Sequence, residues 1–408
     1  DMQVEKGADK SLGFNFEVED LQSIRQELST ALDESDDAKL NWLRIGPNNV
    51  AGRTRDIIMD QDNPAILYAG GAAGGIFKSN TNGQYWEPVE TNYDQGVLSV
   101  TSIDQSPDGS IYYSTGDFFD MPNITKQGVA SFAGGGVFKK AQDSDVFNQI
   151  PCTEPADNED YFGITQIAIA DDSHLYAATW KGLYHIYVDG DWTDEKLLSG
   201  YASDVQINDD GVIIAAVGGE VFRKAADEDS FQKVSGDEAD QIASGGVRYE
   251  FDFAPSNDDY LYAIASNNNG SLKGIYRSTD AGLSWEAISV AGSDDFRVLK
   301  RIYRVQDSTF VDLSGKSSMM IAVDDEDPDY VYVGGVNMWA GYKTEGNVQF
   351  QWNQKTYNQS PKTFSLYLTT HQHQMIHHPN SDISYIACDG GVFRYDPTLG
   401  TTALNTYL

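Results

Sequence analysis

The sequence predicts an all-β protein built from repeated four-stranded units. Aromatic residues make up 12% of the 408 residues, including 23 tyrosines, and the chain contains 38 glycines. This composition favours strands joined by many turns. From Asn41 onwards one pattern recurs: an apolar strand, a turn of Asp, Asn or Pro, a Tyr-rich strand, a Gly turn, a strand ending in an aromatic residue, and a fourth strand. The repeat predicts a seven-bladed β-propeller, in which radial sheets pack face to face.

Seven copies of this repeat can be counted. Several first strands are apolar on both faces, which requires a neighbour on each side, and radially stacked blades supply that environment. A count of six or eight blades stays open if a weak unit, such as residues 203–234, is divided differently. The predicted first strands are residues 55–59, 99–103, 164–169, 203–207, 249–253, 319–323 and 372–376. The second strands centre on Tyr68, Tyr112, Tyr176, Ile214, Tyr262, Tyr332 and Tyr385.

The clearest turn between a third and a fourth strand lies in residues 274–285, GIYRSTDAGLSW. Its side chains follow the pattern S-x-D-x-G-x-x-W, at Ser278, Asp280, Gly282 and Trp285. Ser and Asp can cap backbone N–H groups in a tight turn, Gly takes a positive φ, and Trp returns on the next strand to be buried. These residues support a turn and are not specific for an activity.

A second copy of this turn occupies residues 78–86, KSNTNGQYW. Ser79, Gly83 and Trp86 are in place, and Thr81 stands where the first copy has Asp. The pattern resembles the Asp-box, or BNR, repeat of β-propellers. The resemblance implies a propeller fold and a structural role for these side chains.

The chain divides into an N-terminal extension, residues 1–40, and the propeller, residues 41–408. Residues 17–39 predict one amphipathic helix, because apolar residues recur at helical spacing. We expect this helix to pack on the domain; a partner-binding helix is the alternative. We also expect the natural chain to continue beyond Leu408, since its last residues contain no capping motif. Three insertions long enough to carry function are residues 115–134, 291–317 and 341–370.

The net charge of the chain is −34. Binding to nucleic acid or to an anionic membrane by charge neutralisation is therefore not expected. No apolar run approaches membrane-spanning length, so no membrane insertion is predicted. The two cysteines, Cys152 and Cys388, lie in distant repeats and do not indicate a disulfide framework. Such acidity is typical of an extracellular protein, or simply of a well-solvated surface.

Three segments carry a wider resemblance, namely residues 42–79, 319–339 and 371–394. They are similar to the large secreted propellers of Bacteroidetes-type bacteria, in the sortilin-like and BNR-repeat group. The resemblance covers about residues 42–400. It implies a protein that is secreted or placed on the outer cell surface, in association with secretion or surface machinery. Export by the type IX system, which uses a C-terminal sorting domain after the propeller, is implied in the same way.

The candidate ligand site is the mouth of the central channel, where the first strands begin. Counting back from the second-strand tyrosines makes Asp56, Glu250 and His373 equivalent. Thr54, Arg248 and His371 then form a second equivalent set, with Arg53 and Arg55 close by. Arginines donate bidentate hydrogen bonds and carboxylates accept hydroxyls, so this ring can bind a carboxylate- or sugar-bearing ligand. The alternative is a hydrated rim with no dedicated ligand.

No cofactor is expected, although two kinds of metal site remain as alternatives. His371, His373 and His377 share one face of a strand, and Asp389 can complete a set of ligands. The turn at Pro379 is expected to carry His377 away from the other two histidines, which opposes a shared metal site. The acidic turns at residues 207–211 (with Asn208, Asp209 and Asp210) and 188–191 can bind Ca²⁺, but neither has a full calcium loop.

Hydrolase signatures are incomplete. Sialidases use three arginines and a Tyr nucleophile paired with Glu; Arg53, Arg248 and Arg297 can be proposed as the triad, yet the context GRTR departs from the Arg-Ile-Pro of that family. Propeller endoglucanases resemble residues 66–78 more closely, but this chain has Ala72 and Ala73 where their acid falls. Asp56 with Glu250 remains as a candidate acid–base pair.

These observations favour a non-enzymatic binding module, secreted or on the cell surface, with a protein or a glycan as partner. The first alternative is a glycoside hydrolase, sialidase-like or endoglucanase-like, that acts at the channel mouth. The second is a structural or assembly component whose outer blade faces make the contacts.

Overall fold

Seven four-stranded antiparallel sheets follow one another along the chain, each a meander in sequence order. The computed structural model describes residues 52–92, 98–119, 133–189, 191–290, 296–305, 308–343, 349–358 and 365–405. The predicted helix at residues 17–39 lies outside this part of the chain. These sheets belong to one unit, Pro47–Leu408, which is described here by itself.

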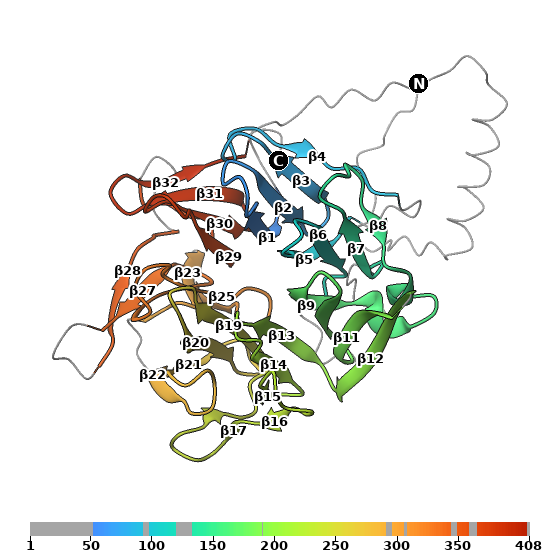
Figure 1. Cartoon of the computed structure of the whole chain (residues 1–408). Coiled ribbons are helices and arrows are strands. Elements are labelled where there is room, and N and C mark those ends of the chain that lie inside the picture. The colour runs from blue at the N-terminus through green and yellow to red at the C-terminus, as the bar shows by residue number, and fades with distance from the viewer. Residues whose placement is uncertain are drawn as a thin grey trace, which may run out of the picture. The chain divides into compact units, whose positions relative to one another are not determined.

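The first four blades cover the N-terminal half of this unit (Figure 1). Blade 1 is β1 (Thr54–Met59), β2 (Leu67–Gly71), β3 (Gly75–Ser79) and β4 (Glu87–Pro88); blade 2 is β5 (Val100–Gln105), β6 (Ile111–Thr115), β7 (Val137–Lys140) and β8 (Asn148–Gln149). Blade 3 is β9 (Ile164–Asp171), β10 (His174–Thr179), β11 (Gly182–Asp189) and β12 (Asp191–Ser199); blade 4 is β13 (Ala202–Ile207), β14 (Ile213–Val217), β15 (Glu220–Lys224) and β16 (Gln232–Lys233).

Three further blades complete the ring. Blade 5 is β19 (Arg248–Ala254), β20 (Asn257–Ser266), β21 (Leu272–Ser278) and β22 (Glu286–Val290); blade 6 is β25 (Met320–Val323), β26 (Tyr330–Gly334), β27 (Trp339–Tyr342) and β28 (Gln351–Gln354); blade 7 is β29 (Gln372–His377), β30 (Ser384–Cys388), β31 (Gly391–Asp396) and β32 (Gly400–Ala403). Two-stranded sheets lie between blades: β17 (Ser235–Gly236) with β18 (Ile242–Ala243), and β23 (Lys300–Val305) with β24 (Ser308–Leu313). The described helices are two 3₁₀ turns, η1 (Pro151–Thr153) and η2 (Glu159–Phe162).

The first strands of neighbouring blades lie side by side around a central axis, and β29 returns to lie beside β1 (Figure 1). All seven predicted first strands overlap an observed one, and every predicted second-strand centre falls in the strand that follows. The seven-bladed propeller is therefore confirmed, and counts of six or eight blades are excluded. No helix in the described ranges is long and apolar enough to span a membrane.

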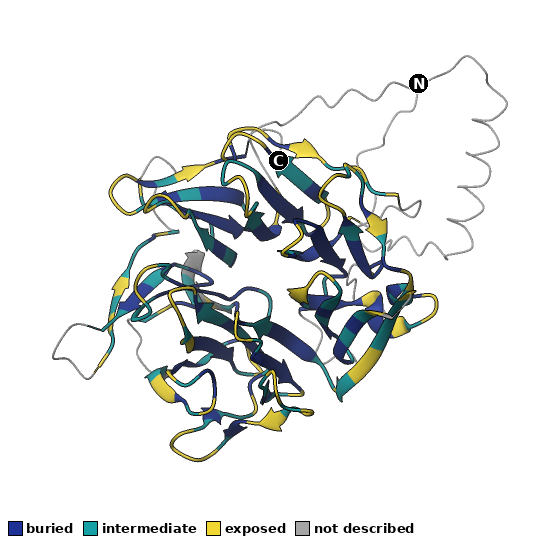
Figure 2. Ribbon diagram, viewed as in Figure 1, coloured by how far each residue is buried: buried dark blue, intermediate teal, exposed yellow. Residues whose placement is uncertain are grey.

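The core lies between the faces of adjacent blades, while the outermost strands are the most exposed (Figure 2). Between blades 4 and 5, for example, Phe251 and Trp285 pack together with Ile214 and Leu261. The second-strand tyrosines also join neighbouring blades. Tyr262 is fully buried and donates its hydroxyl to the carbonyl of Pro328 in blade 6, at 2.7 Å. A buried aromatic ring stabilises the fold by about 2 kcal/mol or more, which explains why this position repeats.

The turn at Ser278–Trp285 has the hydrogen bonds that its sequence predicts. The hydroxyl of Ser278 donates to Asp280 Oδ1 (2.7 Å) and accepts the N–H of Gly282 (2.8 Å). Gly282 has φ +86°, and Trp285 is buried. The turn is thus closed by its own side chains, none of which points to a ligand.

The copy in blade 1 adds a contact that closes the ring. Ser79 accepts the N–H of Gly83 (3.0 Å), and Thr81 takes the place of Asp by accepting the N–H of Tyr85 (3.0 Å). The indole N–H of Trp86 donates to the carbonyl of Leu404 at 2.8 Å. Because Leu404 follows the last strand, this bond ties the first blade to the end of blade 7.

Five first strands contain a β-bulge near their start, and the bulged residues are Arg55 in β1, Thr101 in β5, Thr165 in β9, Ser203 in β13 and His373 in β29. An extra residue of this kind re-aims its side chain. The pairing of first with second strands also corrects the alignment made from sequence. Tyr385 pairs with Ile376, so the position equivalent to Asp56 and Glu250 is Gln374 and not His373. His373 is instead the counterpart of Arg55, because the turn of blade 7 is one residue shorter.

Candidate functional site

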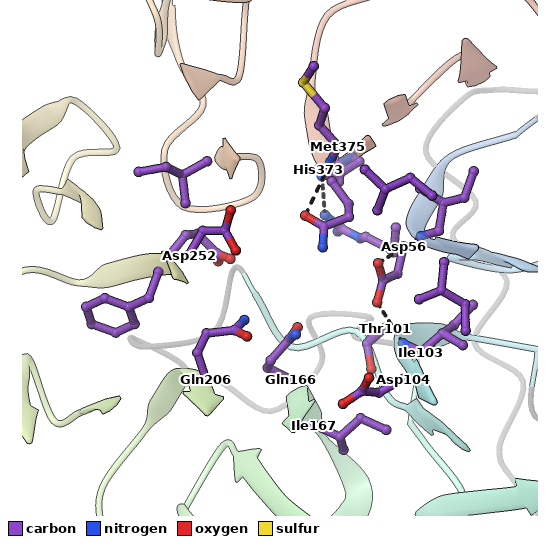
Figure 3. A pocket seen from close by; sticks show the side chains of 18 of the residues that line it. Asp56, Thr101, Ile103, Asp104, Gln166, Ile167, Gln206, Asp252, His373 and Met375 are labelled. Carbon is purple, nitrogen blue, oxygen red and sulfur yellow. Dashed lines mark hydrogen bonds between the residues drawn. The ribbon is translucent and has the colours of Figure 1, made fainter. Parts of the chain in front are cut away.

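A cavity of about 170 Å³ lies on the propeller axis. Five of the predicted site residues line it: Arg55, Asp56, Arg248, Glu250 and His373. Other side chains around the same space are Asp104, Gln166, Gln206, Asp252 and Gln374, which come from different blades (Figure 3). Arg53 and His371 do not line the cavity. They join the site at its mouth, through Asp389.

Asp56 is buried, and both oxygens of its carboxylate accept backbone N–H groups. Oδ1 accepts from Ile57 (2.7 Å), and Oδ2 accepts from Ile103 in the next blade (2.6 Å; Figure 3). First strands of adjacent blades share no ladder, so this N–H has no strand partner. A buried N–H without an acceptor costs about 1–3 kcal/mol. Asp56 therefore joins two blades.

The same contact recurs around the channel. Asp104 accepts the N–H of Ile169 (2.8 Å), Asp204 that of Phe251 (2.6 Å), and Asp252 that of Val323 (2.7 Å). Burial raises the pKa of Asp56 and of Asp252 to about 7, and that of Asp104 to about 6, although the N–H donors act in the opposite direction. These four carboxylates join neighbouring blades. The sequence predicts ligand binding for one of them, Asp56.

Arg55 is the most enclosed cation at the mouth, with a side chain only 2% exposed. Its Nε and Nη2 donate to Asp117 Oδ2 at 3.0 and 2.5 Å. Its Nη1 donates to the carbonyl of Ser317 (2.6 Å) and to His373 Nδ1 (3.2 Å). Burial lowers the pKa of Arg55, and the charge of Asp117 opposes that shift. Four of the five N–H groups of this guanidinium therefore donate to acceptors inside the protein.

His373 continues this network to Asp389. Since its Nδ1 accepts from Arg55, its Nε2–H donates to Asp389 Oδ1, at 2.8 Å. Burial lowers the pKa of His373 to about 3, with the charge of Arg55 acting in the same direction, so the ring is neutral. Asp389 also accepts from His371 Nδ1 (2.8 Å) and from Arg53 Nε (2.7 Å). Although burial opposes it, hydrogen bonds from His371 and His373 hold the pKa of Asp389 well below its usual range.

Arg248 and Glu250 form a third ion pair, at 2.6 Å, and Arg248 Nη1 donates to the carbonyl of Lys316 (3.1 Å). Phe119 lies against both buried arginines: the guanidinium carbon of Arg248 is 4.2 Å, and that of Arg55 4.8 Å, from its ring centroid. Cation–π contacts of this length are stabilising when the cation is desolvated. Phe119 therefore sits at the mouth as an apolar element held by two cations.

The parts of the mouth that sequence reasoning did not assign come from the long insertions. Asp117 and Phe119 follow β6, and the carbonyls of Lys316 and Ser317 precede β25. Insertion length was the only signal available, because no motif surrounds these residues. Asp389 was considered only as a metal ligand, whereas it accepts hydrogen bonds from two histidines and an arginine.

The histidine site and the acidic turn at residues 207–211 find no support as metal sites among the described residues, and the turn at residues 188–191 lies partly outside them. His377 donates to or accepts from Ser384 Oγ at 3.0 Å, away from the Asp389 network that holds His371 and His373. Asn208 caps its own turn by accepting the N–H of Val212 (2.8 Å). Within the described ranges no three His, Cys, Asp or Glu side chains come together as metal ligands.

No described protein family and no curated protein matches the sequence. Solved structures do share the fold. An ancestral GH74 enzyme matches with a TM-score of 0.60 at 15% identity, over 89% of this chain and 47% of its own. YCF48 bound to D1 peptide matches with a TM-score of 0.51 at 13% identity, over 84% of this chain and 92% of its own. YCF48 from Cyanidioschyzon merolae matches with a TM-score of 0.50 at 12% identity, over 85% of this chain and 97% of its own.

These likenesses establish a propeller fold that is shared with enzymes and with a peptide-binding protein. The chain spans about half the length of the GH74 enzyme, 47%. At identities of 12 to 15% the comparison carries the fold and no activity.

Proposed function

We propose that this propeller is a non-enzymatic binding module, secreted or on the outer cell surface, that holds a protein or glycan partner at the channel mouth. One observation carries the proposal: the acidic groups at the mouth already have protein partners. Asp56 accepts two backbone N–H groups, and Glu250 pairs with Arg248. Catalysis by an acid–base pair needs carboxyl groups that can reach substrate and exchange protons. A preorganised rim of paired charges suits recognition instead.

Arg53 is the residue through which a partner is most readily held. Its side chain is 39% exposed, while the other two arginines of the mouth are buried. The pairing with Asp389 fixes its orientation. YCF48, a propeller of the same fold, binds a peptide, which supports a polypeptide as one class of partner. Secretion, association with surface machinery and type IX export are supported by the sequence resemblance and by the charge of −34.

A binding test can use displayed random peptides and an array of glycans as probes. Ligands selected by the intact chain should lose about tenfold or more in affinity on Arg53→Ala, because one charge-assisted hydrogen bond contributes roughly 1.5–3 kcal/mol. Arg394→Ala, which removes an arginine paired with Asp396 on blade 7, is the matched control. Selected ligands that bind both variants equally well would contradict the mouth as the site.

Hydrolysis at the mouth is the second candidate, and one observation favours it. Asp56 and Glu250 line one cavity, and burial raises the pKa of both carboxyl groups. We expect no release of reducing sugar or sialic acid from a panel of polysaccharides and sialosides. Turnover that disappears on Asp56→Asn or Glu250→Gln, in variants that remain folded, would establish the hydrolase and overturn the binding module.

The third alternative is an assembly component that makes contact through its outer blade faces. It predicts that binding of the partner slows hydrogen exchange in the outer strands β4, β12 and β16. Protection at Arg53 and its neighbours would instead favour the mouth.

A further inference from the structure

We infer that a second groove, between blades 3 and 4, is a binding site for an oligosaccharide of pyranose sugars. The groove lies at the end of the channel opposite the mouth. Its floor is formed where the first strands end, at Gln105 of β5, Asp171 of β9 and Ile207 of β13. The site is distinct from the one proposed above and does not depend on it.

The groove has the size of a ligand site. Its volume is about 710 Å³, within the range of roughly 300–1,000 Å³ that small-molecule sites occupy. The central cavity, at about 170 Å³, is much smaller. One wall comes from β9 and β10 of blade 3, and the other from β13, β15 and the turn around Asp209 and Gly211 of blade 4.

An array of flat rings begins in this groove. His174 and Tyr176 on β10 line it, and His185 and Tyr187 on β11 extend the same face of blade 3. The rings of Tyr176 and His185 are 4.8 Å apart and inclined by 13°, and those of His174 and His185 are 5.1 Å apart and inclined by 20°. Side chains at alternate positions of two paired strands share a face, so the four rings are aligned there.

The polar groups around these rings have hydrogen-bonding capacity to spare. Lys224 lines the groove, and within the described ranges its ammonium group makes no hydrogen bond or ion pair. Asp209 also lines the groove, and its carboxylate accepts no hydrogen bond from any other described residue. Among the described residues, the carboxylate of Asp171 accepts one hydrogen bond, from the N–H of Ser173 to Oδ1 (2.8 Å). Two carboxylates and one ammonium group can therefore bind hydroxyl groups.

This combination fits a pyranose better than other ligands. The C–H face of a sugar ring packs on a flat aromatic ring, while its hydroxyls need charged donors and acceptors at the edge. A purely apolar ligand would bury Lys224 and the carboxylates without partners, which is costly. A metal ion would need a third ligand beside His174 and His185, and the described residues supply none.

The inference can be tested by calorimetric titration of the intact chain with cello-, xylo-, manno- and laminari-oligosaccharides. At least one series should bind, and Lys224→Ala should weaken that binding by about tenfold, the effect of losing one charged hydrogen bond. Tyr176→Leu should weaken it similarly, since leucine keeps most of the apolar volume but removes the flat ring. His174→Ala gives a third variant on the same wall.

Two controls separate this site from the mouth. Arg53→Ala should leave oligosaccharide binding unchanged, and so should Tyr85→Ala, which removes an exposed tyrosine from blade 1. Thermal unfolding shows whether each variant is folded. Failure of all four sugar series to bind, or binding that survives every folded groove variant, would overturn the inference. Binding lost only on Arg53→Ala would assign the sugar to the mouth and so support the proposed function alone.

Discussion

The carboxylate of Asp56 in β1 accepts the backbone N–H of Ile103 in β5 at 2.6 Å, and so joins the first strands of two adjacent blades. Three further aspartates repeat this contact around the channel. The first strands of different blades share no backbone ladder. In four of them an aspartate carboxylate, two residues or more from the start of the strand, makes the hydrogen bond to the next blade instead. These buried acids are therefore part of the fold.

Replacing one of these acids by its amide should destabilise the propeller. In Asp56→Asn one oxygen remains as acceptor, but the new amide N–H₂ group must face a buried N–H. We expect a loss of about 1–3 kcal/mol in the free energy of unfolding, measured by urea denaturation. Asp210→Asn, in an exposed turn, should change stability by no more than about 0.5 kcal/mol. Equal effects of the two substitutions would contradict the role given to Asp56.

The stability of the inter-blade contacts should depend on pH with a defined sign. The folded-state pKa of Asp104, about 6, lies above its ordinary value of 3.8. The stability contributed by this group is therefore fully present below pH 3.8 and is lost as the pH rises towards 6. Asp104→Asn removes this dependence, so its destabilisation relative to wild type should be larger at pH 4 than at pH 8. A deficit that grows with pH would contradict the raised pKa.

His373 should produce the opposite trend. Its folded-state pKa, about 3, lies below the ordinary value of 6.5, so its contribution to stability is fully present above pH 6.5 and falls as the pH drops towards 3. His373→Gln retains hydrogen-bonding groups but does not titrate. Between pH 7 and pH 4 this variant should therefore lose less stability than wild type does, as measured by thermal or urea unfolding at each pH. An identical pH dependence of the two proteins would argue against a neutral, buried His373.

The ion pair of Arg55 with Asp117 should matter more than that of Arg53 with Asp389. Asp117→Ala leaves the buried guanidinium without its charged partner, which costs about 3–5 kcal/mol in comparable sites. Arg53→Ala removes a cation that is 39% exposed, and solvent screening limits the loss to about 1 kcal/mol or less. Urea denaturation of both variants tests this order. A larger loss from Arg53→Ala would reverse our assignment of the structural and ligand-facing arginines.

Closure of the ring should depend on Trp86. Trp86→Phe removes the hydrogen bond to the carbonyl of Leu404, and we expect hydrogen exchange to accelerate in β32 and β1. Trp285→Phe is the matched control, because the indole of Trp285 bonds to Gly282, three residues away in its own turn. Exchange in β32 and β1 that is unchanged by Trp86→Phe would show that packing alone closes the ring.

How much of this could be predicted depends on the range of the interactions. The turn at Ser278–Trp285 and the seven first strands are local patterns, because a hairpin and an alternating apolar strand are specified by neighbours in sequence. The position of His373 was predicted one residue out of register, since the turn between the first two strands of blade 7 is one residue shorter and the spacing does not show this. Asp117 and Phe119 were missed because their partners lie in other blades and insertions.

The sequence by itself determined the propeller fold, the order of the strands within a blade and the turns between them, for each of these follows from a periodicity that repeats along the chain. The structure decided for seven blades, where the sequence left six or eight open. Only the tertiary structure decided what the polar residues do. Asp56 became a link between blades, and Arg55 became part of a buried network with Asp117 and His373. The physical reason is that burial and pairing depend on which residues meet across the channel, and closing the ring brings together residues as far apart as Arg55 and His373.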